Sequence, residues 1–165
     1  MRHGKSLLVP HLKSIRDYWL DRRGRRRMPA RSDLDPCDVP ALIPYFLLTD
    51  VTYDPLSFRY RLIGTQITQI SGRDATGRTI DEDLYGEKAE RVKRAYLQVV
   101  ASREPVAVRE VAQFVRKDWL RIEALLLTLG ETDEQVTMIL SSVGVLEKSE
   151  ARFTDDTRIE LDWRR

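Results

Sequence analysis

The side chains that most often carry out catalysis or bind metals are scarce in this chain. Its 165 residues include one cysteine, Cys37, and two histidines, His3 and His11. Their positions do not match the spacing of a metal site or of a nucleophile paired with a base. Three acidic residues at 81–83 are adjacent, but acids at the start of a helix favour the helix dipole without any catalytic role. The residues predict no catalytic site, no metal site and no enzyme.

A second chemical pattern lies around Gly72 and Gly77. Their spacing, followed by Arg78 and Thr79, comes one residue from the nucleotide-binding pattern G-x4-G-K-[ST]. Arg78 stands where that pattern has the lysine that reaches the phosphates. We interpret the two glycines as turn positions rather than as a phosphate-binding loop.

Basic residues are concentrated near the N-terminus. Residues 1–31 carry a net charge of +8, and the remainder carries −6. Such a segment can be solvated, can pair with acids of its own chain, or can bind an anion such as a cyclic dinucleotide. Aromatic residues are not interleaved with the arginines, so binding to nucleic acid is not expected. The candidate anion-binding residues are Arg22, Arg23, Arg25, Arg26 and Arg27.

The composition is that of a globular domain with terminal extensions. Hydrophobic residues make up 42% of the chain and charged residues 33%, which excludes an extensively disordered chain. No apolar run approaches the roughly 20 residues of a membrane-spanning helix. A single cysteine suits a reducing compartment, so we expect a cytoplasmic protein.

The segment from Lys5 to Arg22 predicts an amphipathic helix. Its regular part should begin near Val9, because Pro10 suits a first helical turn. Its apolar residues fall on one stripe. A lone helix must bury such a stripe on its own domain or on a second copy of the chain. We predict a homodimer interface made by Leu8, Leu12, Ile15 and Trp19.

The central part of the chain predicts an α+β fold. Strand patterns at 45–53 and 58–63 precede a helix at 81–102, and strand patterns at 106–115, 119–129 and 136–146 follow it. The interior between this helix and the sheet is either a close-packed core or a cavity for a small apolar or amphipathic molecule. The candidate lining residues are Leu62, Leu84, Tyr96, Phe114, Ile122, Leu126, Met138 and Leu140.

Three segments of the sequence support a resemblance to a known family. They read MPARSDLDP at 28–36, FRYRLIGT at 58–65 and GRDATGR at 72–78. With the order of elements, they resemble the PAS fold over about residues 15 to 147, and in particular stand-alone PAS proteins common in alphaproteobacteria. The resemblance implies a five-stranded antiparallel sheet of order 2-1-5-4-3 with helices on one face, to which the N-terminal helix is added. It also implies roles in sensing or protein interaction and frequent homodimers.

The resemblance also bears on cofactors and domain limits. PAS relatives that bind haem supply an axial histidine from the helical side, and photoactive flavin relatives supply a reactive cysteine there. His3, His11 and Cys37 lie outside the predicted pocket, so His-ligated haem and covalently bound flavin are not expected, and the cofactor stays unknown. We divide the chain into an N-terminal helix and basic arm at 1–35, a PAS-like domain at 36–147 and a charged tail at 148–165.

Three hypotheses of function follow. The first is a cytoplasmic sensory or regulatory PAS protein that binds a small molecule or a partner protein and signals through a dimer interface. The second is an interaction adaptor without a ligand, whose binding surface is the helix stripe or the sheet face around Trp119, Arg59 and Arg61. The third is an anion or cyclic-dinucleotide binder that uses residues 22–27.

Overall fold

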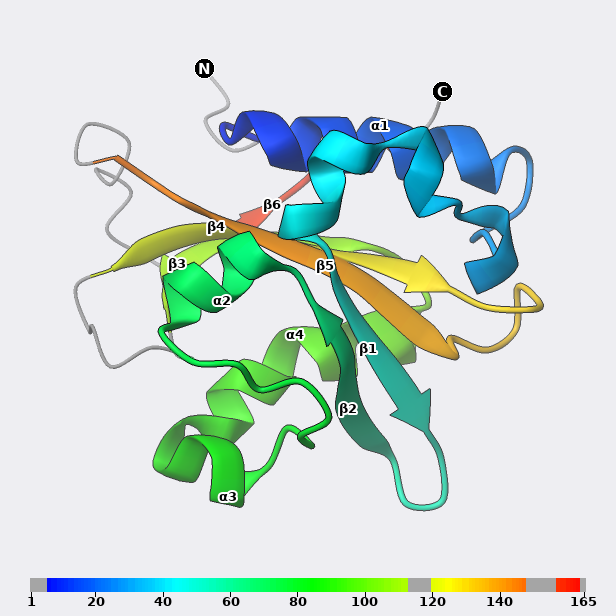
Figure 1. Ribbon diagram of the computed structural model, residues 1–165. Coiled ribbons are helices and arrows are strands. Elements are labelled where there is room, and N and C mark those ends of the chain that lie inside the picture. The colour runs from blue at the N-terminus through cyan, green and yellow to red at the C-terminus, as the bar shows by residue number, and fades with distance from the viewer. Residues whose placement is uncertain (1–5, 113–119, 148–156, 164–165) are drawn as a thin grey trace.

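An antiparallel sheet forms the centre of the protein, and helices cover both of its faces (Figure 1). The computed structural model describes residues 6–112, 120–147 and 157–163. The order of the strands is β2-β1-β5-β4-β3-β6, which confirms the predicted order of the first five. The strands are β1 (Leu47–Thr52), β2 (Ser57–Ile63), β3 (Val106–Val111), β4 (Arg121–Leu129), β5 (Met138–Val145) and β6 (Thr157–Ile159).

The sixth strand was not predicted. β6 pairs antiparallel with β3 at the edge of the sheet, with Ala107 opposite Ile159. Three residues are too few to show the alternation by which a strand is recognised in a sequence. The tail therefore contributes to the sheet, and Ile159 is buried in the common core.

The helices divide between the two faces of the sheet. α1 (Pro10–Arg23) lies across one face, and α2 (Thr65–Ser71), α3 (Glu82–Tyr85) and α4 (Ala89–Ser102) lie on the other (Figure 1). Gly86 has a φ of 58°, which interrupts the helix predicted at 81–102 and separates α3 from α4. The short 3-10 segments are η1 (Arg31–Asp33), η2 (Pro36–Asp38), η3 (Pro40–Tyr45) and η4 (Gly86–Lys88).

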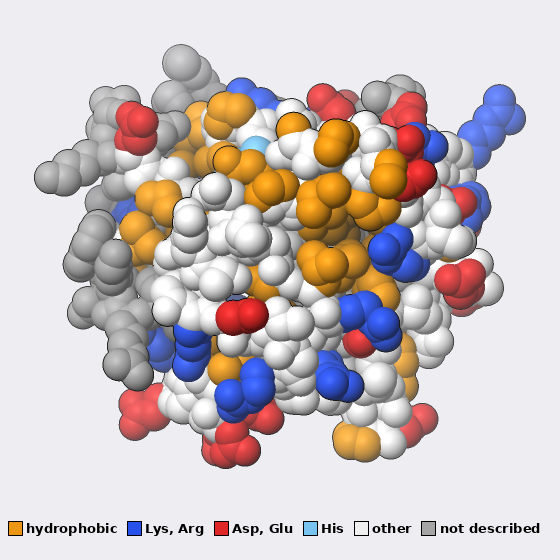
Figure 2. Space-filling model, viewed as in Figure 1, with side chains coloured by type: hydrophobic (Ala, Val, Ile, Leu, Met, Phe, Trp, Pro, Cys, Tyr) orange, Lys and Arg blue, Asp and Glu red, His pale blue; other side chains and the backbone are white. Residues whose placement is uncertain are grey.

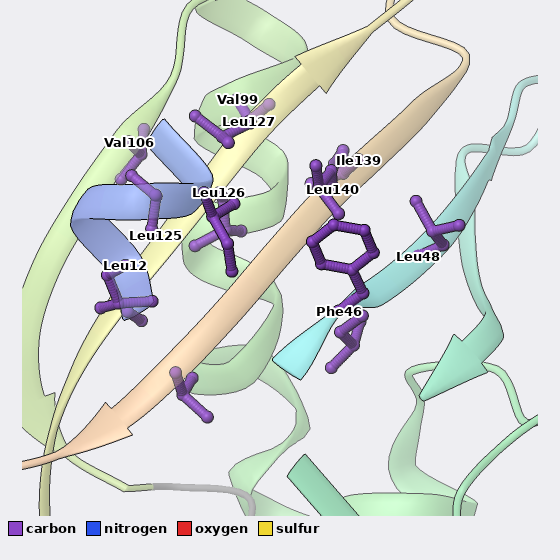
Figure 3. Close-up of a cluster of buried hydrophobic side chains, with 14 of the residues drawn as sticks. Leu12, Phe46, Leu48, Val99, Val106, Leu125, Leu126, Leu127, Ile139 and Leu140 are labelled. Atoms are coloured by element: carbon purple, nitrogen blue, oxygen red, sulfur yellow. The ribbon is translucent and has the colours of Figure 1, made fainter. Parts of the chain in front are cut away.

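Strand β4 is buried on both sides because helices lie above and below it. Every residue of β4 after Arg121 is buried. Ile122, Ala124 and Leu126 point toward the α4 side, and the residues between them point toward α1. Figure 3 shows labelled side chains of the core from α1, β1, β4, β5 and α4. A strand of this kind reads as a nearly continuous apolar run, so its sequence does not show which parity faces which helix.

Helix α1 buries its apolar stripe on its own sheet. Leu12, Ile15 and Trp19 are fully buried within the single chain, and the Trp19 indole Nε1 donates a hydrogen bond to the Thr128 carbonyl oxygen at 2.8 Å. These three side chains can contact a second copy only if α1 leaves the sheet, whereas Leu8 is half-buried. Because α1, the sheet and Ile159 share one core, the predicted divisions at 35 and 147 do not separate independent cores.

A buried ion pair fixes the segment that leads into α1. The Arg109 Nε donates to a Glu123 carboxylate oxygen at 2.9 Å, and both side chains are almost completely buried. The same carboxylate accepts hydrogen bonds from the backbone N–H groups of Leu8 at 2.8 Å and Val9 at 2.9 Å. Arg109 also donates to the Ser6 carbonyl oxygen at 2.6 Å. The pair therefore ties the start of α1 to β3 and β4.

A glycine on β5 allows the segment that leads into α1 to pack closely on the sheet. A Cβ atom on Gly144 would lie 2.4 Å from Cγ1 of Val9, which is closer than two non-bonded carbon atoms can come. Gly144 pairs with Glu123 across the sheet, so the close contact and the ion pair act on the same stretch of backbone. Only glycine at 144 lets Val9 pack on the sheet in this position.

We expect Glu123→Gln to lower the free energy of unfolding by about 3–5 kcal/mol, because it removes the buried negative charge that pairs with Arg109. Urea unfolding measures this loss, and hydrogen exchange at the Leu8 and Val9 amides should accelerate. Glu134→Gln is the control, since Glu134 pairs with Arg103 at 3.2 Å on the surface and should cost at most about 1 kcal/mol. Equal losses in the two variants would contradict the role of Glu123.

We expect Gly144→Ala to destabilise the fold by about 1–3 kcal/mol through overpacking against Val9. Val9→Ala should destabilise the wild-type chain but stabilise the Gly144→Ala chain, because it removes the clash. A double-mutant cycle on thermal or urea unfolding checks this coupling. Additive losses from the two substitutions would show that Val9 does not contact position 144.

Candidate functional site

A cavity of about 70 Å³ lies between the sheet and the layer formed by α2, α3 and α4. Residues from both layers line it, so it occupies the interior that the order of elements predicts. Much of its wall is apolar. The apolar lining includes Leu47, Ile63, Ile67, Val92, Ile122 and Leu126.

Hydroxyl groups form a polar region in this wall. The hydroxyls of Tyr60 and Tyr85 are hydrogen-bonded at 2.7 Å. The Tyr96 hydroxyl faces the hydroxyls of Tyr60, Ser141 and Thr49. Tyr60, Tyr85, Tyr96 and Ser141 line the cavity, whereas Thr49 is fully buried and is not part of the lining. The hydroxyls that face the cavity are therefore those of the three tyrosines and Ser141.

Burial keeps the tyrosine hydroxyls protonated. It raises the pKa of Tyr60 well above its usual value and raises the pKa of Tyr96 as well. Burial is also the main reason that the pKa of Tyr85 rises to about 12. These groups therefore act as neutral donors and acceptors of hydrogen bonds at physiological pH.

Charged groups at the cavity come from its exposed side. Arg73 lines the cavity but is exposed, and its Nη2 donates to the Leu84 carbonyl oxygen at 2.8 Å. Its guanidinium carbon lies 5.2 Å from the centre of the Tyr85 ring. Glu110 of β3 is partly buried and also lines the cavity. One basic and one acidic side chain thus border a site whose inner wall is neutral.

The structure places the predicted pocket residues in different regions. Tyr96, Ile122 and Leu126 line the cavity. Leu84 is buried in the core at α3 but is not part of the cavity lining. Phe114 lies outside the described residues.

Leu62 was assigned to the pocket incorrectly, because of a β-bulge. Leu48 pairs with Leu62 but Thr49 pairs with Tyr60, so Arg61 is an extra residue in β2. The bulge reverses the alternation of side chains after Tyr60. As a result Leu62 is 40% exposed, and Ile63 lines the cavity in its place.

Met138 and Leu140 were also assigned to the wrong face. They pair with Leu129 and Leu127 of β4, which point toward α1. The opposite parity of β5 reaches the cavity instead, through Ser141 and Val143. Both parities of this strand are largely buried, so alternation in the sequence could not distinguish them.

Sequence reasoning missed Tyr60, Tyr85 and Arg73 as site residues. The alternation of β2 places Tyr60 on the buried face, and this signal could have identified it. Tyr85 and Arg73 belong to the irregular stretch between β2 and α4, which has no period to follow. Their position depends on tertiary packing.

The arginines of the basic arm are largely engaged within the chain. Arg22 contacts the Asp38 carboxylate at 2.5 Å, and Arg26 pairs with Asp33. Arg23 donates to the Trp163 carbonyl oxygen at 2.6 Å. The remaining two are Arg25, which is exposed, and Arg27, which lies 3.5 Å from Glu104. On the face shown in Figure 2, basic and acidic side chains lie near one another. The paired arginines are thus less available to an external anion than their spacing suggests.

Comparison with known protein families agrees with the geometry. The family described as PAS domain matches residues 8–146. The chain belongs to the PAS domain family. PAS domains are generally sensory rather than catalytic. A comparison with curated proteins found no match.

Of the residues considered for cofactor binding, His11 and Cys37 are not in the cavity wall, and His3 lies outside the described residues. His11 lies on the other face of the sheet, where its Nε2 is 2.9 Å from the Val143 carbonyl oxygen and its ring stacks on Tyr45. Burial lowers the pKa of His11. Cys37 is exposed in η2. Neither residue is placed to ligate a haem or to bond a flavin within the cavity.

Within residues 6–112, 120–147 and 157–163, no group of three or more His, Cys, Asp or Glu side chains could hold a metal ion. In the same ranges, no helix has the length and apolar character needed to cross a membrane.

We expect Tyr85→Phe to flatten the loss of stability above pH 10. The unfolded chain ionises Tyr85 near pH 10, whereas the folded chain keeps its proton until about pH 12. Between these values the unfolded state binds fewer protons, so this group lowers the free energy of unfolding by at most about 1.4 kcal/mol per pH unit. Urea unfolding from pH 8 to 11 measures how steeply the free energy of unfolding falls with pH in the wild-type chain and in Tyr85→Phe. Identical slopes would show that Tyr85 is not shielded from water.

Proposed function

We propose that this PAS protein is a sensor that binds a small molecule in the cavity and passes the state of the cavity to helix α1. The observation that carries the proposal is the cavity wall, in which apolar side chains surround a group of buried hydroxyls. Tyr60, Tyr96 and Ser141 belong to that wall and give a ligand hydroxyl groups to bond to.

Strand β4 provides the route from the cavity to α1. Ile122 and Ala124 line the cavity, while Glu123 between them holds the start of α1 on the other face. A ligand that changes the position of β4 by a small amount changes the hydrogen bonds of Leu8 and Val9. It can favour one arrangement of α1 only by binding more tightly to that arrangement.

The output side of the proposal concerns α1. If α1 separates from the sheet, Leu12, Ile15 and Trp19 become available to a second copy or to a partner protein. The predicted homodimer therefore depends on the position of this helix. We place the protein in the cytoplasm on the basis of its single, reduced cysteine.

A ligand-free adaptor is the second candidate, and exposed apolar side chains favour it. Ile43 of η3 is 37% exposed and Leu62 of β2 is 40% exposed. Apolar side chains gather on the face of the molecule shown in Figure 2. The surface first predicted for an adaptor fits less well, because Arg61 pairs with Asp50 at 2.9 Å and Trp119 lies outside the described residues.

We expect Ala124→Leu to abolish binding in the cavity, because the larger side chain fills space that a ligand needs. Wild-type protein purified from its native host should release a stoichiometric small molecule on denaturation, as seen by comparing native and denatured masses. Ala101→Leu on the exposed side of α4 is the control and should retain the molecule. If the wild-type protein carries no molecule and takes none up from native extract, the adaptor is favoured over the sensor.

A further inference from the structure

The size and chemistry of the cavity restrict what it can bind. Building on the sensor function proposed above, we propose that the ligand is a small uncharged molecule with one ring and one hydroxyl or carbonyl group, of which phenol is the simplest example. The ring would contact the apolar wall, and its polar group would bond to the hydroxyls of Tyr60 and Tyr96, which line the cavity.

The volume sets the size of the ligand. A cavity of about 70 Å³ holds roughly five to seven water-sized positions at about 10–15 Å³ each. This matches one six-membered ring with a single substituent. A fused-ring cofactor such as a flavin or a haem is several times too large for the cavity in this form.

The hydroxyl groups set the polarity of the ligand. When one of Tyr60 and Tyr85 donates to the other across 2.7 Å, the acceptor of that bond keeps its own proton for another partner. A hydroxyl or carbonyl oxygen of a ligand in the cavity can accept that proton. An apolar ligand of equal size would offer it no acceptor.

Among the described residues, no buried cation lies at the hydroxyls, which favours a neutral ligand. Tyr60, Tyr96 and Ser141 are neutral, and burial raises the pKa of both tyrosines. An ionised carboxylate placed among them would lose its hydration without gaining an opposite charge. Arg73 lies instead at the exposed side, against the Tyr85 ring.

Calorimetric titration of the full chain with phenol, toluene and benzoate tests the proposal. Phenol and toluene have the same number of heavy atoms, so they differ only in the hydroxyl that the site would bind. We expect phenol to bind at least about tenfold more tightly than toluene and benzoate to bind more weakly than phenol.

Two matched variants identify the hydroxyls responsible. Tyr96→Phe keeps the ring and removes a hydroxyl of the cavity lining, so it should reduce the preference for phenol over toluene. Tyr53→Phe is the control, because the Tyr53 hydroxyl donates to the Val136 carbonyl oxygen at 2.6 Å and Tyr53 is not part of the cavity lining. It should leave the preference unchanged.

Three results would overturn the ligand class, and they are separable from failure of the sensor function. Equal affinities for phenol and toluene would show that the hydroxyls do not bind the ligand. Tightest binding of benzoate would show an anion site at Arg73. Failure of all three probes, while the Ala124→Leu comparison shows a native ligand, would reject the class and keep the sensor function. Failure of the probes and of the native ligand would reject both.

Discussion

The arrangement of this protein depends on the buried carboxylate of Glu123. A fully buried negative charge is tolerable only when charges and hydrogen bonds surround it, and Arg109 with the N–H groups of Leu8 and Val9 meets this need. The segment before α1 therefore has to cross the sheet at β4. This crossing places α1 on the face opposite α4, buries both sides of the central strands, and leaves the cavity on the α4 side as the internal space that a ligand can enter.

Much of the fold was predictable because its signals are local. Pro10 and Gly24 limit α1, Gly72 ends α2, and the apolar runs give the strands and their family-like order. The cavity residues were harder to predict, for two physical reasons. The bulge at Arg61 reverses the faces of the residues that follow it in β2, and a strand buried on both sides carries no alternation that distinguishes Leu140 from Ser141. The polar region of the site also depends on irregular backbone around Tyr85, whose position is set by tertiary contacts.

The chemistry of the described residues favours recognition over catalysis. The arginines that suggested an anion site pair largely with acids and carbonyl groups of the same chain. The unusual polar groups are instead inside, where three tyrosines and Ser141 belong to the cavity wall. Hydroxyls in an apolar environment are suited to hold a neutral ligand by directional bonds. Since Ala124 and Glu123 are neighbours on β4, the strand that lines the cavity also contacts the segment that leads into α1.

The central claim is that occupancy of the cavity changes the hydrogen bonds between the Glu123 carboxylate and the backbone N–H groups of Leu8 and Val9. Hydrogen exchange of the Leu8 and Val9 amides tests it, with the cavity empty and then filled by a molecule that binds the wild-type chain but not the Ala124→Leu variant. The account predicts that filling the cavity changes exchange at these two amides as well as in α4. Exchange that changes in α4 and the cavity wall but stays the same at Leu8 and Val9 would contradict the coupling across β4.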